Sequence, residues 1–438
     1  MVSTAHPQLE RPVFIVDGSR SPFLKFRIRP GPFKAIELAV QTARPLLLRQ
    51  PFEAGVLDEV ILGCVAPGAE EMNIARVAAL RMECGNDVPA WTVQRNCGSG
   101  LQAIDSAFRN IASGRADLVL AGGVEAMSHA PLLLQDKMVA WLAAWRAAGT
   151  RQRLRLIATL RPSDLAPVSG LLKGLTDPVT GLSMGQTAEN LAYRFGISRE
   201  DMDAYACESH RRLHRVQETP GSLREIEVIY DRDGNAYDRD DGVRPDTTID
   251  KLAALKPTFD KPFGKVTAGN SAQVSDGAAW LILASEAAVN RHRLNPSARI
   301  VDCEWTGLDP AQMGLGPVYA MAPLLARNAL ETTHIDYWEI NEAFAAQVLA
   351  CLAAAADAEY CRQELGLDSA PGEIPHERLN VDGGAIGLGH PVGASGARVV
   401  LHLMHVLERE RALRGVAALC IGGGQGGAML IENLHVRA

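Results

Sequence analysis

Two cysteines and one histidine, each set among glycines, are the residues of this sequence best suited to chemistry. Cys97 stands in NCGSG, immediately before a stretch with the apolar spacing of a helix. His390 stands in GGAIGLGHPVGASGAR, and Cys420 ends an apolar run directly before IGGGQGG. Glycine lets the backbone approach a ligand closely, so this composition is more typical of a site than of packing. A thiol beside an imidazole base is an arrangement for nucleophilic catalysis.

The surroundings of Cys97 favour a reactive thiol. The stretch 98–114 predicts a helix whose amino end, with its unpaired N–H groups and positive dipole end, faces the sulfur. That position lowers the pKa of a thiol and makes thiolate available near neutral pH. The backbone N–H of Cys97 could also stabilise an oxyanion. The alternative is an inert cysteine, because free cysteine is among the most buried residue types.

Three further residues could complete such a site. His390 is the candidate base, with a capping or core histidine as the alternative. Cys420, at the end of a buried strand, could reach a pocket and carry a proton. Asn341 lies in EINEAFAAQ between a buried strand and an alanine-rich helix, where its amide could hold a water or a carbonyl. The alternative for Asn341 is simple capping of that helix.

Composition excludes several other classes of protein. The chain has 438 residues, a net charge of −7 and 47% hydrophobic residues, which suits a large folded core and not general nucleic-acid binding. The amino terminus lacks the pattern of a secretory signal, and no apolar run is long enough to span a membrane. None of the eight cysteines forms a C-x-x-C pair, so we expect no metal site, no disulfide framework and a cytoplasmic location.

Segments with the apolar spacing of strands alternate along the chain with segments that have the spacing of helices, and this alternation predicts an α/β layered fold. Short β-like runs ending in glycine alternate with helical spacing in the first part, and a similar set returns near the end. This return hints at an internal duplication. The strand-like runs of the first part are 12–18, 58–68 and 116–128, and the second set covers 298–308, 334–356, 396–412 and 416–432.

The middle of the chain has a different character. The stretch 132–165 is basic, with six lysines and arginines against two aspartates. Its residues Met138, Trp141, Leu142 and Trp145 would share one helical face. We read this middle as an insertion that covers the core, with contact to a partner or to a membrane surface through 132–160 as the alternative use of the tryptophan helix.

Taken together and in this order, NCGSG, NEAFA, GGAIGLGHPVGASGAR and CIGGGQGG resemble the motifs of the thiolase family, over essentially the whole chain. The resemblance implies an α/β fold of two similar βαβαβαββ halves, which form a five-layered α-β-α-β-α core with an inserted loop domain. The first half would cover 1–129 and return over 255–294. The loop domain would cover 130–254, and the second half 295–438.

The resemblance also implies roles for the site residues. Cys97 would be the nucleophile that accepts the acyl group, His390 its base, and Cys420 the acid and base for the acetyl-CoA carbon and the incoming thiol. Asn341, through a water, would form one oxyanion hole with His390. The backbone N–H groups of Cys97 and Gly422 would form the other. Coenzyme A would be a substrate, and no cofactor or metal is implied.

Expected contacts with coenzyme A are less uniform. Met184, Ser271 and Arg244 match family positions near the substrate, and Arg244 would lie by the nucleotide. However, Ser183 stands where many members have histidine, and Ala272 where many have a serine that contacts coenzyme A.

We therefore expect cleavage of 3-ketoacyl-CoA, of medium or long chain, to acetyl-CoA and a shortened acyl-CoA in fatty-acid β-oxidation. Alternatives are an acetoacetyl-CoA thiolase, a ketoacyl carrier-protein synthase, against which NEAFA and Cys420 argue, and a non-catalytic scaffold or docking subunit. The basic middle resembles the thiolase subunit of trifunctional complexes, although that group usually has histidine at the place of Asn341. Expected partners are acyl-CoA and CoA, a second copy in a homodimer or dimer of dimers, and a β-oxidation partner subunit.

Overall fold

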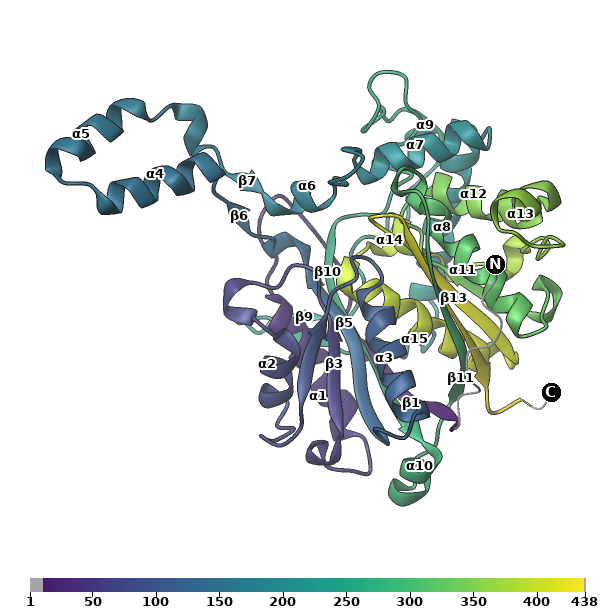
Figure 1. Cartoon of the computed structure of the whole chain (residues 1–438). Coiled ribbons are helices and arrows are strands. Elements are labelled where there is room, and N and C mark those ends of the chain that lie inside the picture. Colours follow the sequence, from purple (N-terminus) through teal and green to yellow (C-terminus); the bar gives the residue numbers. More distant parts are fainter. Residues whose placement is uncertain (1–10, 437–438) are drawn as a thin grey trace.

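One mixed β-sheet of ten strands runs through the protein, whose computed structural model describes residues 11–436 (Figure 1). The strand order is β12-β13-β14-β11-β1-β10-β5-β3-β4, and the short β2 pairs with β10. The strands are β1 (Val13–Arg20), β2 (Leu24–Lys25), β3 (Glu59–Gly63), β4 (Ala90–Val93), β5 (Leu118–Ala126), β10 (Ser275–Ser285), β11 (Ala298–Gly307), β12 (Tyr337–Ile340), β13 (Arg414–Ile421) and β14 (Gln425–Asn433).

The sheet consists of two halves joined at one narrow seam. β1 and β11 pair antiparallel over only three residues on each strand, 13–15 and 298–300. On one side of the seam lie the strands of the first part of the chain, with β10 returning beside β1 over its whole length. On the other side lie β11, β14, β13 and β12.

Helices fill three layers around these two half-sheets. The helices of the body are α1 (Ala35–Leu48), α2 (Ile74–Arg81), α3 (Ser99–Ala112), α7 (Met184–Arg194), α8 (Arg199–Gln217), α9 (Ile249–Ala253), α10 (Glu286–His292), α11 (Gly316–Arg327), α12 (Ala345–Ala356), α13 (Ala358–Glu364), α14 (Ala385–Leu388) and α15 (Val392–Glu410). α3 and α15 lie between the half-sheets (Figure 1), α1 and α2 cover the outer face of the first half, and α11 and α12 that of the second.

Alternation along buried strands explains why the layers stack this way. In β5, Leu118 and Leu120 pack with α1 and α2, whereas Val119 and Ala121 face the central helices. A strand buried on both faces reads as a continuous apolar run, which is the pattern of 116–128 in the sequence. The five-layered α/β fold predicted from the sequence is confirmed.

The second half departs from the predicted βαβαβαββ order at one strand. In the first half β4 pairs parallel with β3 and leads into α3. The corresponding segment before α15 makes only a single parallel bridge, from Leu379 to Trp338 of β12. The cause is visible in the sequence before that segment, where 366–376 is rich in proline, glycine and acidic residues and poor in strand formers.

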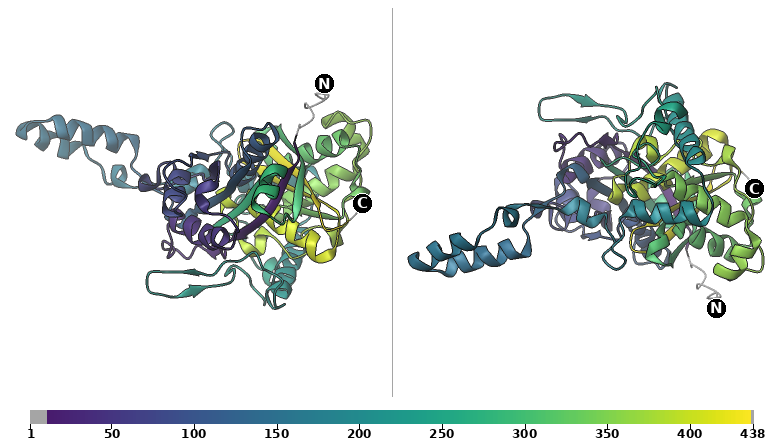
Figure 2. Two further views of the ribbon diagram at one scale, coloured as in Figure 1. Left: turned by 90° about the horizontal axis from the view of Figure 1, so that it is seen from below. Right: turned by 90° about the horizontal axis from the view of Figure 1, so that it is seen from above.

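The predicted insertion has two parts of different character. α7 and α8 do cover the core, because they pack on the outer apolar cluster of the second half. The part before them instead projects from the body as an arm (Figures 1 and 2), so the expectation that it covers the core was wrong. This arm consists of β6 (Leu132–Leu133), α4 (Asp136–Ala147), α5 (Thr150–Thr159) and β7 (Val168–Ser169), followed by the short α6 (Gly170–Gly174) at its base.

The tryptophans of the arm pack within it. Trp141 and Trp145 stack with ring centroids 5.1 Å apart, and Trp141 Nε1 donates to the carbonyl of Leu156 on α5. After the arm, β8 (Ile229–Tyr230) and β9 (Ala236–Tyr237) form a small hairpin around the turn at 231–235. Within residues 11–436 no helix is long and apolar enough to cross a membrane. The domain boundaries at 129, 254 and 294 stay predictions.

We predict that Gly100→Ala destabilises the fold, because α3 meets α15 at this glycine. A β-carbon there would lie 2.7 Å from the backbone nitrogen of Ala397 and 2.9 Å from the carbonyl oxygen of Gly393. Overpacking of this kind costs about 1–3 kcal/mol. Denaturant titration measures the loss, with Gly149→Ala as the control, since a β-carbon added to that glycine would meet open space. Equal stability of the two variants would contradict the close contact.

Candidate active site

Cys97 sits on a tight turn between β4 and α3. Ser99 Oγ accepts from Arg95 N–H at 2.9 Å and donates to the carbonyl of Asn96 at 2.7 Å, which closes the turn. Asn96 has a positive φ of 44°. Its side-chain nitrogen donates to the carbonyl of Gly422 at 2.7 Å. This bond ties the NCGSG turn directly to the glycine run after Cys420.

The electrostatics of the Cys97 thiol differ from the sequence expectation. The backbone N–H groups of Gly422 and of Cys97 itself favour the thiolate form of the sulfur. Burial nevertheless raises the pKa of Cys97 above its ordinary value, because desolvation of the sulfur outweighs both donors. The predicted lowering of this pKa by the end of α3 was therefore wrong. Cys97 therefore rests as a thiol near neutral pH, and it could act as a nucleophile only if a base took its proton.

Cys420 lies opposite, at the end of β13. Burial raises its pKa well above the ordinary value, and the next contribution comes from the charge of Cys97. The segments that carry the two cysteines are in contact, because the side chain of Asn96, next to Cys97, donates to the carbonyl of Gly422, two residues after Cys420. The structure thus brings together the two cysteines that the sequence singled out, more than 300 residues apart in the chain.

His390 is held so that one ring nitrogen is bare. The backbone N–H of His390 donates to the carbonyl of Gln273 at 3.0 Å, and the ring nitrogen Nδ1 lies 2.6 Å from Ser395 Oγ. Ser395 Oγ already donates its proton to the carbonyl of Pro391 at 3.1 Å. Ser395 must therefore accept from Nδ1–H, which leaves Nε2 as the unprotonated nitrogen.

The environment of His390 keeps the ring neutral. Burial, and then the positive charge of Arg398, lower the pKa of His390 to about 4. Nε2 is buried and has no hydrogen-bond partner among the described residues. A neutral imidazole with a free, enclosed lone pair is suited to accept a proton from a thiol.

Asn341 presents both side-chain polar atoms without a protein partner. Oδ1 and Nδ2 are buried and unbonded among the described residues, while the backbone N–H donates to the carbonyl of Ala418 at 2.9 Å. An unsatisfied buried polar group costs about 1–3 kcal/mol, so such groups mark places for water or substrate. The capping alternative does not hold, since α12 begins at Ala345 and its N-cap is Phe344.

The other expected substrate contacts lie around this centre. Met184 begins α7, and its sulfur lies 3.2 Å from the place of a β-carbon on Gly422. Ser183 instead caps α7 by accepting from Gln186 N–H. The hydroxyl of Ser271 donates to the carbonyl of Thr267 at 2.7 Å, so its proton is used within the protein.

Arg244 belongs to a small basic group at the edge of the 384–389 loop. Its backbone N–H donates to His210 Nδ1 at 3.3 Å, and that ring packs against Gly387. Burial, followed by the charge of Arg244, lowers the pKa of Lys25. Neighbouring cations of this kind are suited to bind phosphate oxygens.

Sequence reasoning missed two residues that support the centre. Ser395 fixes the tautomer of His390, and its place one turn into the helix after His390 could have suggested it. Glu125, at the end of β5, accepts the N–H groups of Val65, Ala66 and Gly393, and burial raises its pKa to about 7. No spacing in the sequence indicates a buried carboxylate at that place.

Comparison with known proteins agrees with this geometry. The sequence matches the family described as Thiolase, N-terminal domain, over residues 13–287 and Thiolase, C-terminal domain, over residues 294–433. It is 40% identical to a beta-ketoadipyl-CoA thiolase of Pseudomonas aeruginosa, over 97% of this chain and 100% of that protein. The chain belongs to the thiolase family and is an acyltransferase of that class.

Two solved structures share the fold at similar identity. Human mitochondrial 3-ketoacyl-CoA thiolase in complex with CoA is 35% identical with a TM-score of 0.83, and the match covers 98% of this chain and 100% of that one. The acetyl-CoA acetyltransferase of Bacillus anthracis is 36% identical with a TM-score of 0.82, over 97% and 99%.

We predict that alkylation of Cys97 by iodoacetamide in the free protein is slow at pH 7 and rises with pH into the alkaline range. The reason is that burial raises the thiol pKa, and only the thiolate reacts. Mass spectrometry of the labelled peptide measures the rate, and Cys97→Ser gives the background. A rate that stays constant between about pH 6 and pH 8 would show a stable thiolate instead.

Proposed function

We propose that this thiolase cleaves 3-ketoacyl-CoA by acyl transfer through Cys97. The observation that supports the proposal is that the segments of Cys97 and Cys420 are tied by the bond from Asn96 to Gly422, while His390 Nε2 and the Asn341 amide are buried without partners among the described residues. The proposal includes a cytoplasmic location, which the eight cysteines that remain free support.

The first half-reaction makes an acyl-enzyme. His390 Nε2 takes the proton of Cys97, and the thiolate attacks the 3-keto carbon of the substrate. The bond between C2 and C3 then breaks, and its electron pair forms the enolate of acetyl-CoA. Cys420 gives its proton to the carbon of that enolate, which leaves as acetyl-CoA. The protonated ring of His390 and a water on Asn341 donate to the enolate oxygen, and one such donor is worth about 3 kcal/mol.

The second half-reaction returns the enzyme to its resting state. Thiolate at Cys420 takes the proton of an incoming CoA thiol, whose sulfur attacks the thioester on Cys97. The N–H groups of Cys97 and Gly422, which face the sulfur in the resting structure, donate to the oxyanion of this step. The shortened acyl-CoA leaves, and Cys97 takes back the proton that His390 held. Two thiols are needed because one group cannot be nucleophile and proton donor in one step.

Chain length and pathway are the finer part of the proposal. We favour 3-ketoacyl-CoA substrates of β-oxidation, and the second candidate is acetoacetyl-CoA, since a relative named acetyl-CoA acetyltransferase is about as similar. The name of the Pseudomonas relative points to a substrate with a second carboxylate. Turnover of 3-ketoacyl-CoA from about four to sixteen carbons, with beta-ketoadipyl-CoA included, separates these substrates.

We predict that Cys97→Ser abolishes turnover while CoA binding survives. A serine hydroxyl is a far weaker nucleophile without its own activation, whereas the contacts to CoA lie elsewhere. Steady-state thiolysis and calorimetric titration with CoA measure the two properties. Acyl-CoA should also block labelling of Cys97 in the unmodified protein. Normal turnover of the variant would refute the role of Cys97, and unprotected labelling would favour a non-catalytic docking subunit.

We also propose that the arm contacts an anionic membrane surface. Its six basic residues oppose the net charge of −7 of the whole chain. Exposed apolar side chains accompany them, with Leu154 66% and Ile157 54% exposed on α5. A basic helix with exposed apolar residues suits the interface of an anionic bilayer. A homodimer or dimer of dimers and a β-oxidation partner subunit stay predictions.

We predict that Leu154→Glu with Ile157→Glu weakens binding to vesicles that contain phosphatidylglycerol, because it removes apolar area and adds negative charge. Co-sedimentation with such vesicles, against phosphatidylcholine alone, measures binding. Val179→Glu is the control, since Val179 is exposed outside the arm. Thiolase turnover should not change. Equal sedimentation of both variants, or none by the unmodified protein, would discard membrane contact.

A further inference from the structure

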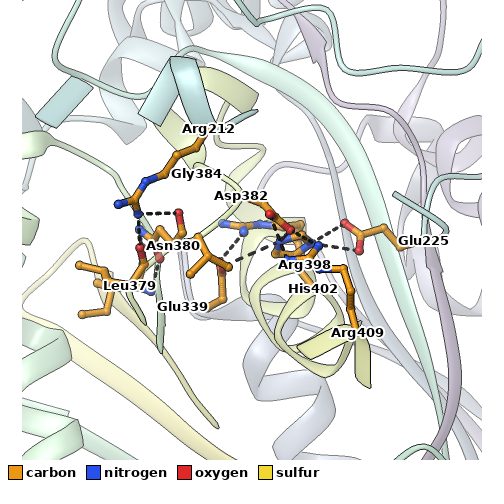
Figure 3. A network of polar contacts seen from close by, with 12 residues as sticks. Arg212, Glu225, Glu339, Leu379, Asn380, Asp382, Gly384, Arg398, His402 and Arg409 are labelled. Atoms are coloured by element: carbon orange, nitrogen blue, oxygen red, sulfur yellow. Dashed lines mark hydrogen bonds and ion pairs between the residues drawn. The ribbon is translucent and has the colours of Figure 1, made fainter. Parts of the chain in front are cut away.

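A buried cluster of charges lies along α15, the helix that follows His390 (Figure 3). At its centre is His402. Nδ1 of this ring lies 3.0 Å from both carboxylate oxygens of Glu225. On the other side, Nε2 lies 3.3 Å from Asp382 Oδ2 and 3.9 Å from Glu339 Oε1. The mechanism proposed above does not use His402.

The geometry requires that His402 be protonated on both nitrogens. A neutral imidazole has one N–H, and an ionised carboxylate can only accept. Here each ring nitrogen faces a carboxylate, so both must donate. Burial opposes the positive charge, but Glu225 and Asp382 outweigh it and raise the pKa of His402 to about 10.

Each carboxylate around His402 is shared with one arginine. Arg20 Nε donates to Glu225 at 2.8 Å, Arg409 to Asp382 at 2.6 Å, and Arg398 to Glu339 at 2.9 Å. A fourth buried carboxylate, Asp240, holds the other side of Arg20 at 2.7 and 2.9 Å. Four cations thus meet four anions only when His402 is charged. His405, one turn further, is the other titratable group of α15 that acts on Glu225.

The three carboxylates come from segments with different tasks. Asp382 begins the loop that leads to His390, and Glu339 lies in β12 two residues before Asn341. Glu225 belongs to the segment after α8 whose backbone pairs with Arg20 of β1. The imidazole of His402 therefore connects β1 and the segment of Glu225 on one side with the two segments that lead to His390 and Asn341 on the other.

The loop that begins at Asp382 depends on the contact with His402 to hold its position. It contains four glycines between 383 and 389, two of them with positive φ, and glycine contributes no side chain to hold the loop. A shift of about 1 Å in a catalytic group can cost about 100-fold in rate.

We propose that protonated His402 is a positioning residue for acyl transfer, which holds the 382–390 loop and the end of β12 so that His390 Nε2 and the Asn341 amide face Cys97. This inference rests on the proposed function. It predicts that the two sides of the ring have different effects: the Asp382 side sets the reaction rate, and the Glu225 side sets stability.

The test compares three variants that each remove one negative charge at nearly constant shape. Asp382→Asn should lower kcat by about tenfold or more and change KM for CoA by less than about twofold. Glu225→Gln should lower the melting temperature but keep kcat within about threefold, because the tie to the loop remains. Asp302→Asn, which removes a carboxylate that pairs with Arg327, should leave kcat unchanged.

Two further readouts separate positioning from simple stabilisation. Acylation of Cys97 in a single turnover of 3-ketoacyl-CoA, which depends on His390 as its base, should slow in Asp382→Asn alone, whereas alkylation at a pH where the thiolate forms without a base should not change. The ¹⁵N shifts of the imidazole should show His402 protonated on both nitrogens at about pH 8. Unchanged kcat in Asp382→Asn, equal loss of kcat in Glu225→Gln, or a neutral His402 would overturn the inference. Absence of turnover in the unmodified protein would instead overturn the proposed function, while the imidazole shifts would still test the charge.

Discussion

The site depends on one close contact between the two helices of the central layer. The first turns of α3 and α15 meet at Gly100 and Gly396, where added β-carbons would collide with the backbone of the opposite helix. Each helix is preceded by a candidate catalytic residue, Cys97 for α3 and His390 for α15. Because the helices cannot separate without opening the core between the half-sheets, the contact fixes where the sulfur and the imidazole lie.

Burial decides the protonation states of Cys97 and His390. The amino end of α3 and two N–H donors favour thiolate at Cys97, yet desolvation is larger and raises the pKa. The same desolvation, with the charge of Arg398, holds His390 neutral. The resting pair is therefore a thiol and a free base, and not an ion pair.

The sequence predicted the chemistry of the site better than its energetics. Glycine motifs pointed to both cysteines and His390, and the boundary between a strand and a helix pointed to Asn341; their catalytic roles stay predictions. Their meeting could be expected only from the resemblance, since the partners are hundreds of residues apart. The direction of the Cys97 pKa could not be predicted, because it is a balance of burial against donors that no motif records.

The fold, too, could be predicted from the sequence only in part. Buried strands such as β5 were visible as continuous apolar runs, and α3 was visible from its periodicity. The helix after His390 begins at Val392, with Pro391 as its N-cap. The projecting arm was mistaken for a cover, because an apolar face that packs within a helical hairpin has the same spacing as one that packs on a core.

The raised pKa of the half-buried Cys97 also affects how the protein withstands oxidants. Peroxide attacks thiolate, and the sulfinic acid formed after two steps is not returned to thiol by ordinary reductants. A nucleophile with a lowered pKa would be exposed to this loss between turnovers. Here desolvation keeps the sulfur of Cys97 protonated near neutral pH, so this cysteine is less open to oxidation while no substrate is bound.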